Sequence, residues 1–133
     1  MTRVAILVDD HDHARPLARA ITDLDAGWLV THAPDVRGLA TMLAGVIPDV
    51  VITDLRVPGV ASPVDCLDRV RALWSGPLVA LTGDGSAEAA HACIRFAARL
   101  HLKPRTPHEV VAALDAIVTE TAPAGAHPRR GDP

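Results

Sequence analysis

Five polar residues that could do chemistry stand at the ends of four apolar runs: Asp9, Asp10, Asp54, Thr82 and Lys103. Each lies at or just beyond the carboxyl end of its run. In an open parallel sheet those ends meet at one edge, where such folds bind ligands. We therefore expect three carboxylates, a hydroxyl and an ammonium group to converge. Clustered carboxylates repel one another unless a cation lies among them, and oxygen ligands with open positions suit Mg²⁺.

The ends of the four runs, with the residues that follow them, read VDD, VVITDLRVP, VALTGD and LKP along the chain. Each piece alone is common in proteins. Together, in this order and at strand ends, they resemble the receiver domain of two-component response regulators from residue 3 to about residue 118. The resemblance implies a domain whose protein-binding surface is switched by phosphorylation of one aspartate.

Asp54 is the residue that the resemblance identifies as the phospho-acceptor, and a carboxylate that attacks phosphorus gives an acyl phosphate. In the family the second residue of the acidic pair, here Asp10, binds Mg²⁺ directly, and the first, Asp9, often acts through water. Asp54 itself and the backbone carbonyl of Arg56 would be the remaining protein ligands of the metal. The competing interpretations are a strand-end aspartate that caps a loop and a solvated acidic turn.

Lys103 and Thr82 complete the site that the resemblance implies. Lys103 would place its charge on a phosphoryl oxygen, and it would pair with Asp54 before phosphorylation. Thr82 matches the family's switch hydroxyl, which donates to the phosphoryl group and moves its loop; a plain strand end before the turn at residues 83–85 is the alternative. Pro104 follows the lysine, and the resemblance implies a cis bond there.

Three features depart from the family pattern or are particular to this chain. Leu100 stands where the family usually has Tyr or Phe, so either another side chain reports the switch or the output surface is unusual. The segment Val57–Ser62 replaces a Met-Pro-x-x-Asp-Gly segment, which makes the loop after the acceptor atypical. Arg56 and Asp84 carry opposite charges on facing loops. We hypothesise that they pair across the mouth of the site and slow attack by water; independent exposure to solvent is the alternative.

His11 and His13 lie beside the acidic pair, and their position could suggest a transition-metal site. We favour solvated polar residues on an exposed loop over the acidic pocket. Mg²⁺ is therefore the one cofactor that we expect from the sequence.

The composition is typical of one cytoplasmic domain with a short tail. The chain of 133 residues fits a single domain at residues 1–120, while residues 121–133, rich in Pro, Ala and Gly, should be disordered and dispensable for folding. A net charge of −3 argues against a general nucleic-acid or membrane surface. No apolar run approaches the roughly 20 residues that cross a bilayer. Cys66 and Cys93 are interpreted as reduced core thiols.

The sequence predicts five strand–helix units. The predicted strands cover Arg3–Val8, Trp28–Thr31, Val50–Thr53, Leu78–Leu81 and Leu100–Leu102, and the predicted helices cover residues 12–24, 35–46, 64–74, 86–97 and 107–118. Ser86 and Thr106 are the expected N-caps of the last two helices, and Val46, Leu73 and Trp74 are expected to face the core. This alternation indicates an α/β fold with a parallel sheet and helices on both faces. The resemblance adds the flavodoxin-like, doubly wound arrangement with strand order 2-1-3-4-5, which the sequence pattern alone does not decide.

These observations predict a receiver that accepts a phosphoryl group on Asp54, with Mg²⁺, from a histidine kinase or a histidine phosphotransfer protein. It should be a signalling domain more than a metabolic enzyme, with an unknown output protein, no nucleic-acid or membrane contact of its own, and a homodimer left open. The alternatives are the receiver part of a longer DNA-binding regulator, an aspartyl-phosphate phosphatase suggested by Asp10-His11-Asp12, and a docking-only pseudo-receiver. The complete acceptor set argues against the last two.

Overall fold

The computed structural model describes residues 3–24, 27–83, 85–103 and 106–121, and within them five strands alternate with five helices. The elements are β1 Arg3–Val8, α1 His11–Leu24, β2 Trp28–Ala33, α2 Val36–Leu43, β3 Val50–Asp54, α3 Pro63–Leu73, β4 Leu78–Thr82, α4 Ala87–Phe96, β5 Arg99–Leu102 and α5 Pro107–Thr121. All strand pairs are parallel, and the sheet order is β2-β1-β3-β4-β5. The predicted flavodoxin-like architecture and its strand order are confirmed.

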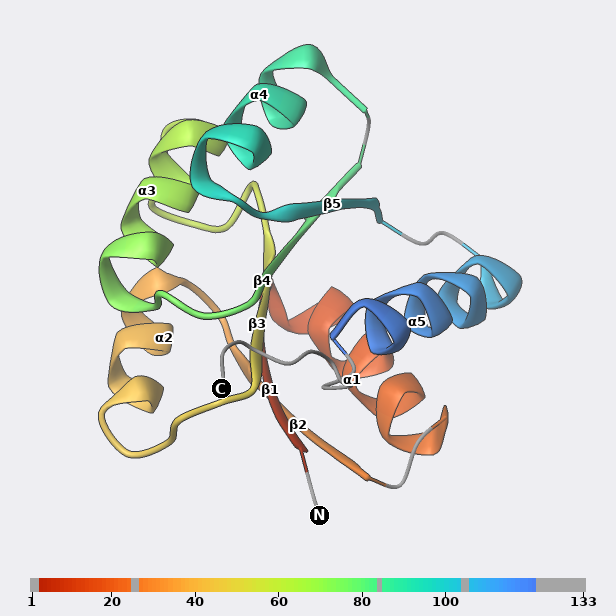
Figure 1. Ribbon diagram of the computed structural model, residues 1–133. Helices are drawn as coiled ribbons and strands as arrows, with labels where there is room; N and C mark the ends of the chain where they lie inside the picture. The colour runs from red at the N-terminus through yellow and green to blue at the C-terminus, as the bar shows by residue number, and fades with distance from the viewer. Residues whose placement is uncertain (1–2, 25–26, 84, 104–105, 122–133) are drawn as a thin grey trace, which may run out of the picture.

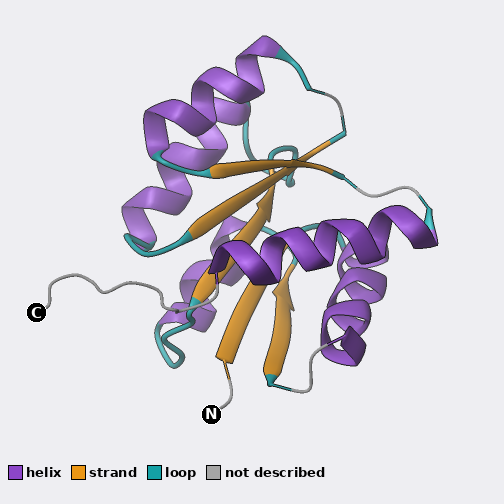
Figure 2. Ribbon diagram, turned by 45° about the vertical axis from the view of Figure 1, so that its right-hand side comes forward, coloured by secondary structure: helices purple, strands orange, loops and turns teal. Residues whose placement is uncertain are grey.

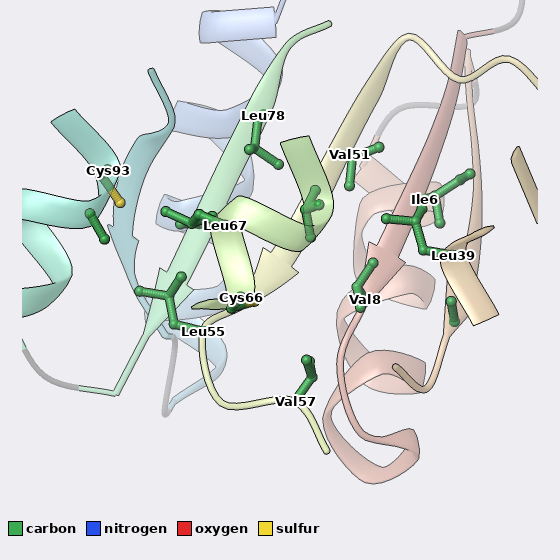
Figure 3. Packing of buried hydrophobic residues seen from close by; sticks show 14 of the residues in the cluster. Ile6, Val8, Leu39, Val51, Leu55, Val57, Cys66, Leu67, Leu78 and Cys93 are labelled. Carbon is green, nitrogen blue, oxygen red and sulfur yellow. The ribbon is translucent and has the colours of Figure 1, made fainter. Parts of the chain in front are cut away.

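Helices cover both faces of the sheet, with α1 and α5 on one face and α2, α3 and α4 on the other (Figures 1 and 2). Side chains of a strand alternate between the two faces. In β1, Ile6 and Val8 accordingly pack with the cluster under α2, α3 and α4 (Figure 3), whereas Ala5 and Leu7 pack with the cluster under α1 and α5. Because strands buried on both faces need apolar residues at every position, the near-continuous Val, Leu, Ile and Ala runs follow from this layering.

Local capping chemistry sets the start of several helices. The side chains of Asp35, Ser62 and Ser86 accept hydrogen bonds from Gly38 N, Asp65 N and Ala89 N, respectively. Thr106 Oγ1 accepts from Glu109 N at 3.1 Å, so the N-caps that the sequence predicted for α4 and α5 are confirmed. A side-chain acceptor at each N-cap satisfies a backbone N–H that has no partner within the helix.

Several predicted boundaries were wrong at helix ends. The second helix ends at Leu43 instead of Val46, and Val46 is exposed instead of facing the core. Trp74 does not continue α3 but caps it in an extended conformation, and Leu73 is exposed. An apolar residue at helical spacing follows each helix, Val46 after α2 and Trp74 after α3, so the sequence pattern runs past the hydrogen-bonded turns.

Two further boundaries differ near the start and the end of the chain. Pro16 lies inside α1, beyond its first turn, because that helix begins at His11. At the other end, α5 extends to Thr121. Residues 122–133 lie outside the described ones, so disorder of the tail stays a prediction. Among the described residues, none of the helices is both long and apolar enough to span a bilayer.

Arg71 joins the carboxyl ends of α3 and α4. Its Nε donates to Phe96 O at 2.7 Å and its Nη2 to Ala97 O at 3.0 Å. Its Nη1 donates to Trp74 O at 3.2 Å and to Gly76 O at 2.6 Å. One guanidinium group therefore satisfies four backbone carbonyls at the turns that lead into β4 and β5, the strands that carry Thr82 and Lys103.

We expect Arg71→Ala to lower the free energy of unfolding by about 2–3 kcal/mol, because it leaves charge-assisted acceptors unpaired at two helix ends. Arg69→Ala is the matched control, since the contact that the described residues give Arg69 is a pair with Asp65 on the same helix, 3.0 Å long, and exposed ion pairs contribute little to stability. Urea unfolding followed by circular dichroism measures both. Equal losses in the two variants would show that the carbonyl contacts contribute little.

Candidate functional site

Three of the predicted side chains meet at the carboxyl edge of the sheet. Lys103 Nζ lies 3.2 Å from Asp54 Oδ2, 3.2 Å from Asp9 Oδ2 and 3.3 Å from Asp9 Oδ1. Asp9 is 0% exposed and Asp54 is 7% exposed, while the Lys103 side chain keeps 17% of its surface. The expected pair between Lys103 and Asp54 is present, and Asp9 joins it as a second partner that the sequence did not reveal.

Strand alternation explains why these three side chains meet. Asp9 follows the β1 positions that face α1, and Asp54 continues the β3 positions, Val50 and Ile52, that face the same side. Lys103 follows β5, and its backbone N–H donates to Thr82 O at 2.6 Å, which fixes the strand end beside β4. All three side chains thus leave the sheet toward the same side of its carboxyl edge.

The charges of this trio are unbalanced. Burial and, after it, the negative charge of Asp54 raise the pKa of the Asp9 carboxyl to about 6, against the attraction of Lys103. For Lys103, burial lowers the pKa, but the attraction of Asp54 and Asp9 outweighs it and leaves the pKa above its usual value. Lys103 is therefore protonated at neutral pH, whereas ionisation of Asp9 at that pH lowers the stability of the folded state.

Asp10 divides its two carboxylate oxygens between two tasks. Its Oδ1 accepts from Asp12 N at 3.0 Å and from His13 N at 3.2 Å, which makes Asp10 the N-cap of α1. Its Oδ2 lies 2.7 Å from His13 Nδ1, and the hydrogen bond from His13 holds the pKa of Asp10 below its usual value. The backbone N–H of Asp10 donates to Asp9 Oδ1 at 2.7 Å, so the two acidic residues are linked.

The placement of His13 corrects the sequence interpretation. His13 does not lie on an exposed loop over the acidic pocket; it lies in the first turn of α1 and contacts Asp10 directly. The capping signal, an acidic residue just before a helical pattern, was visible in the sequence and would have placed Asp10 and His13 on the same turn.

Two side chains hydrogen-bond the backbone carbonyl of Asp54 at the end of β3. Thr53 Oγ1 donates to Asp54 O at 2.9 Å, and Cys66 Sγ of α3 donates to the same oxygen at 3.4 Å. Burial raises the pKa of the Cys66 thiol to about 11, so this cysteine stays protonated and unreactive. The prediction of buried, unpaired cysteines is confirmed for Cys66 and Cys93, and the contact with Asp54 is a structural role that the sequence reasoning missed.

Thr82 lies on the opposite face of the sheet from Asp54. Within β4 its side chain is on the same face as those of Leu78 and Ala80, toward α3 and α4, whereas Leu81 is on the other face. It lines a surface groove between the β3–α3 and β4–α4 connections, together with Leu55, Arg56, Val57, Ser86 and Glu88. Thr82 is 5% exposed. The Thr82 side chain therefore lies on the face of the sheet opposite to Lys103, and its predicted role as a switch hydroxyl stays a prediction.

The remaining predicted site residues are placed as follows. Arg56 is exposed at the groove, and coordination of a metal by its carbonyl stays a prediction. Leu100 is half-buried and packs with the cluster under α3 and α4. Pro104 and Asp84 lie outside the described residues, so the cis bond and the pairing of Asp84 with Arg56 also stay predictions.

A family model described as the response regulator receiver domain matches residues 5–115. The chain belongs to this family. The match spans β1 to the middle of α5 and includes every site residue named above, so this is the receiver domain of a two-component response regulator.

Known relatives agree with this assignment. The C4-dicarboxylate transport transcriptional regulatory protein DctD of Pseudomonas aeruginosa is 32% identical over 116 residues, which are 84% of this chain and 24% of DctD. The chain therefore spans about a quarter of that relative's length. The phosphorylated cyanobacterial phytochrome response regulator RcpA has a TM-score of 0.76 at 13% identity, covering 96% of this chain and 99% of its own. Chemotaxis response regulator CheY4 of Vibrio cholerae has a TM-score of 0.69 at 23% identity, and the match covers 88% of this chain and 99% of CheY4. The two structures share the fold.

We expect Asp9→Asn to stabilise the metal-free domain by about 1–3 kcal/mol at pH 8, because it removes a buried charge that repels Asp54. The folded-state pKa of Asp9, about 6, lies above its usual 3.8, so the folded state holds the proton more tightly than the unfolded state. The wild type thus loses stability relative to Asp9→Asn as the pH rises from about 4 to about 6. Urea unfolding in chelator at several pH values measures the difference, which should vanish near pH 4. A pH-independent difference would contradict the assignment.

Proposed function

We propose that this receiver domain is switched by phosphorylation of Asp54, with Mg²⁺ bound at the adjoining acidic residues. The observation that carries the proposal is the convergence of Asp54, Asp9 and Lys103 within hydrogen-bonding distance at the carboxyl edge of the sheet. A carboxylate that is nearly buried yet reaches the surface, beside a fixed ammonium group, is suited to accept a phosphoryl group and to stabilise its charge.

The residues present fit a divalent oxygen-seeking cation. The carboxylates of Asp9 and Asp54 share the ammonium group of Lys103, and Asp10, whose backbone N–H donates to Asp9, adds a third carboxylate nearby, which leaves excess negative charge. Asp9 Oδ2 is buried without a hydrogen bond of proper geometry, although Lys103 lies within ion-pair distance. The Asp10 side chain is 47% exposed, so ligand positions around it open to water. Asp10, Asp9, Asp54 and the Arg56 carbonyl would hold Mg²⁺, which offsets the charge of the incoming phosphoryl group when bound.

In the transfer step an oxygen of Asp54 forms a bond to phosphorus while the phosphorus–nitrogen bond of a kinase or phosphotransfer-protein phosphohistidine breaks. The electron pair of the broken bond stays with the imidazole, which leaves with the donor protein. Lys103, which already donates a hydrogen bond to Asp54 Oδ2, would then place its ammonium group against a phosphoryl oxygen. Lys103 therefore neutralises the acceptor before transfer and the product after it.

Thr82 would convert phosphorylation into a change of surface. Its side chain lines the groove, and a hydrogen bond from its hydroxyl to a phosphoryl oxygen would draw the end of β4 and the following loop toward Asp54. Leu100, which has no polar atom and packs against the same apolar cluster as Phe96, would follow this movement without the swing of an aromatic ring. The outcome would be a repacked surface over α4 and β5, read by an output protein.

The pathway of this receiver belongs to the proposal as well. The phosphodonor would be a cytoplasmic histidine kinase or histidine phosphotransfer protein. Since the chain spans 24% of DctD, one option is that it acts as the receiver of a longer DNA-binding regulator; the other is action through direct protein contact, with homodimerisation as one form. An Asp-x-Asp phosphatase is disfavoured, because Asp12 is exposed on α1 and Asp10 caps that helix.

Incubating the protein with acetyl phosphate and Mg²⁺ should add one phosphoryl group, labile to acid and to base as acyl phosphates are. Asp54→Asn should abolish the label, because it removes the nucleophilic oxygen, while Asp68→Asn on the exposed face of α3 should keep it. Intact-mass spectrometry compares the three proteins. Equal labelling of wild type and Asp54→Asn would place the acceptor elsewhere.

Asp10→Asn should weaken Mg²⁺ binding by at least about tenfold, more than Asp9→Asn does, because Asp10 offers an exposed oxygen whereas Asp9 is tied to Lys103. Asp12→Asn is the control, as an exposed carboxylate on the same turn of α1. Calorimetry measures the affinities. If Asp12→Asn lost as much as Asp10→Asn, general surface charge and not a defined site would explain binding.

A further inference from the structure

His13 makes a contact that phosphoryl transfer does not require. Its Nδ1 lies 2.7 Å from Asp10 Oδ2, and its side chain is 60% exposed. One ligand atom from each of Asp9, Asp10 and His13 can be chosen so that all three atoms lie within 4.8 Å of one another. An imidazole nitrogen thus stands beside carboxylate oxygens at the proposed cation site.

We propose that His13 is a metal ligand of this domain, and that with Asp10 and Asp9 it adapts the acidic site to borderline transition-metal dications such as Ni²⁺ and Zn²⁺. This inference rests on the metal site of the proposed function and adds a residue and a class of ligand to it. It reverses the preference for a solvated histidine that the sequence alone favoured.

The geometry of the Asp10–His13 pair suits joint coordination. Two ligands bound about 2.1 Å from one metal lie about 3.0 Å apart at right angles and about 3.4 Å apart at the tetrahedral angle of zinc sites. The 2.7 Å between His13 Nδ1 and Asp10 Oδ2 is shorter than both separations, so the two side chains would move apart by less than about 1 Å to hold an ion. An ion would enter between them and replace the shared proton, which leaves to solvent. Both groups are on the first turn of α1, so no large backbone movement is needed.

The cap of α1 prepares Asp10 for this role. Because Oδ1 is held by the backbone N–H groups of Asp12 and His13, Oδ2 alone is available, and it points to the imidazole. Because His13 N donates to Asp10 Oδ1, the backbone position from which the imidazole side chain projects is fixed as well. The pair is thus positioned before any ion arrives.

Ligand chemistry predicts which ions respond to His13. Carboxylate and water suit Mg²⁺, which rarely accepts imidazole, whereas imidazole suits Zn²⁺ and Ni²⁺. Any oxygen and nitrogen site favours Ni²⁺ over Mg²⁺ to some extent, because affinity rises along the first-row series. The informative quantity is therefore the dependence of each affinity on His13, not the order of the affinities.

The test uses the full chain without an affinity tag, stripped with chelator, and titrated calorimetrically with Ni²⁺ and with Mg²⁺. His13→Gln keeps an amide that can still hydrogen-bond Asp10 but offers no imidazole. We expect it to weaken Ni²⁺ binding by at least about tenfold and to change Mg²⁺ binding by less than about twofold. His91→Gln, at an exposed position on α4, should change neither. In the wild type, saturating Zn²⁺ should shift the imidazole nitrogen resonances of His13.

Three results would overturn the inference. Equal loss of Ni²⁺ and Mg²⁺ affinity in His13→Gln would mean that His13 only positions Asp10. Unchanged Ni²⁺ affinity in His13→Gln, or a loss seen in His11→Gln instead, would remove His13 from the ligand set. These results leave the proposed function intact as long as Asp10→Asn still loses Mg²⁺ and Asp54 is still phosphorylated; loss of those two findings would reject the proposed function itself.

Discussion

The ammonium group of Lys103 between two buried carboxylates is the interaction on which the site depends. Two unit charges about 4 Å apart interact by about 4 kcal/mol at the effective dielectric constant of a protein surface. The attraction of Lys103 to Asp9 and to Asp54 is therefore comparable with the repulsion between the two carboxylates, and it allows both to be nearly buried. It does not neutralise the cluster, because two carboxylates exceed one ammonium group by one negative charge and the neighbouring Asp10 adds another. The carboxyl edge of the sheet is therefore left with excess negative charge, which is the physical basis for the cation and phosphoryl group proposed there.

The fold serves that interaction by bringing distant strand ends to one edge. Lys103 is separated from Asp54 by 49 residues and from Asp9 by 94, and only the strand order β1-β3-β4-β5 lets them touch. The lysine spans the width of β4 to reach its partners. Thr82, at the end of the intervening strand, consequently faces the groove on the opposite side. The end of β3 thus has Lys103 and Asp9 on one face of the sheet and the groove lined by Thr82 on the other.

The start of α1 combines helix capping with ligand placement. A helix N-terminus needs an acceptor for its first N–H groups, and Asp10 supplies it with one oxygen while it keeps the other for the site. The remaining oxygen lies 2.7 Å from Nδ1 of His13, in the first turn of the same helix. The same aspartate therefore contributes to the stability of α1 and to the chemistry of the site, which makes the orientation of its carboxylate a property of the fold. Hydrogen bonds also fix the backbone of Asp54, because its carbonyl oxygen accepts from Thr53 Oγ1 and from Cys66 Sγ.

The sequence by itself determined the α/β class, the five strand–helix units and the polar residues at their strand ends, because side-chain alternation, helical periodicity and capping are local properties. The caps at Ser86 and Thr106 were predicted in this way and are present. The pair of Lys103 with Asp54, which is present, and the strand order came from the family resemblance, since local patterns do not say which strands pair. The ends of α2 and α3 were misplaced, because apolar residues at helical spacing, Val46 and Trp74, follow the last helical residues. Only the tertiary structure decided that Asp9 shares Lys103 and that His13 meets Asp10. Those contacts depend on how far each side chain projects from its element, and that is settled when the sheet and its helices pack together.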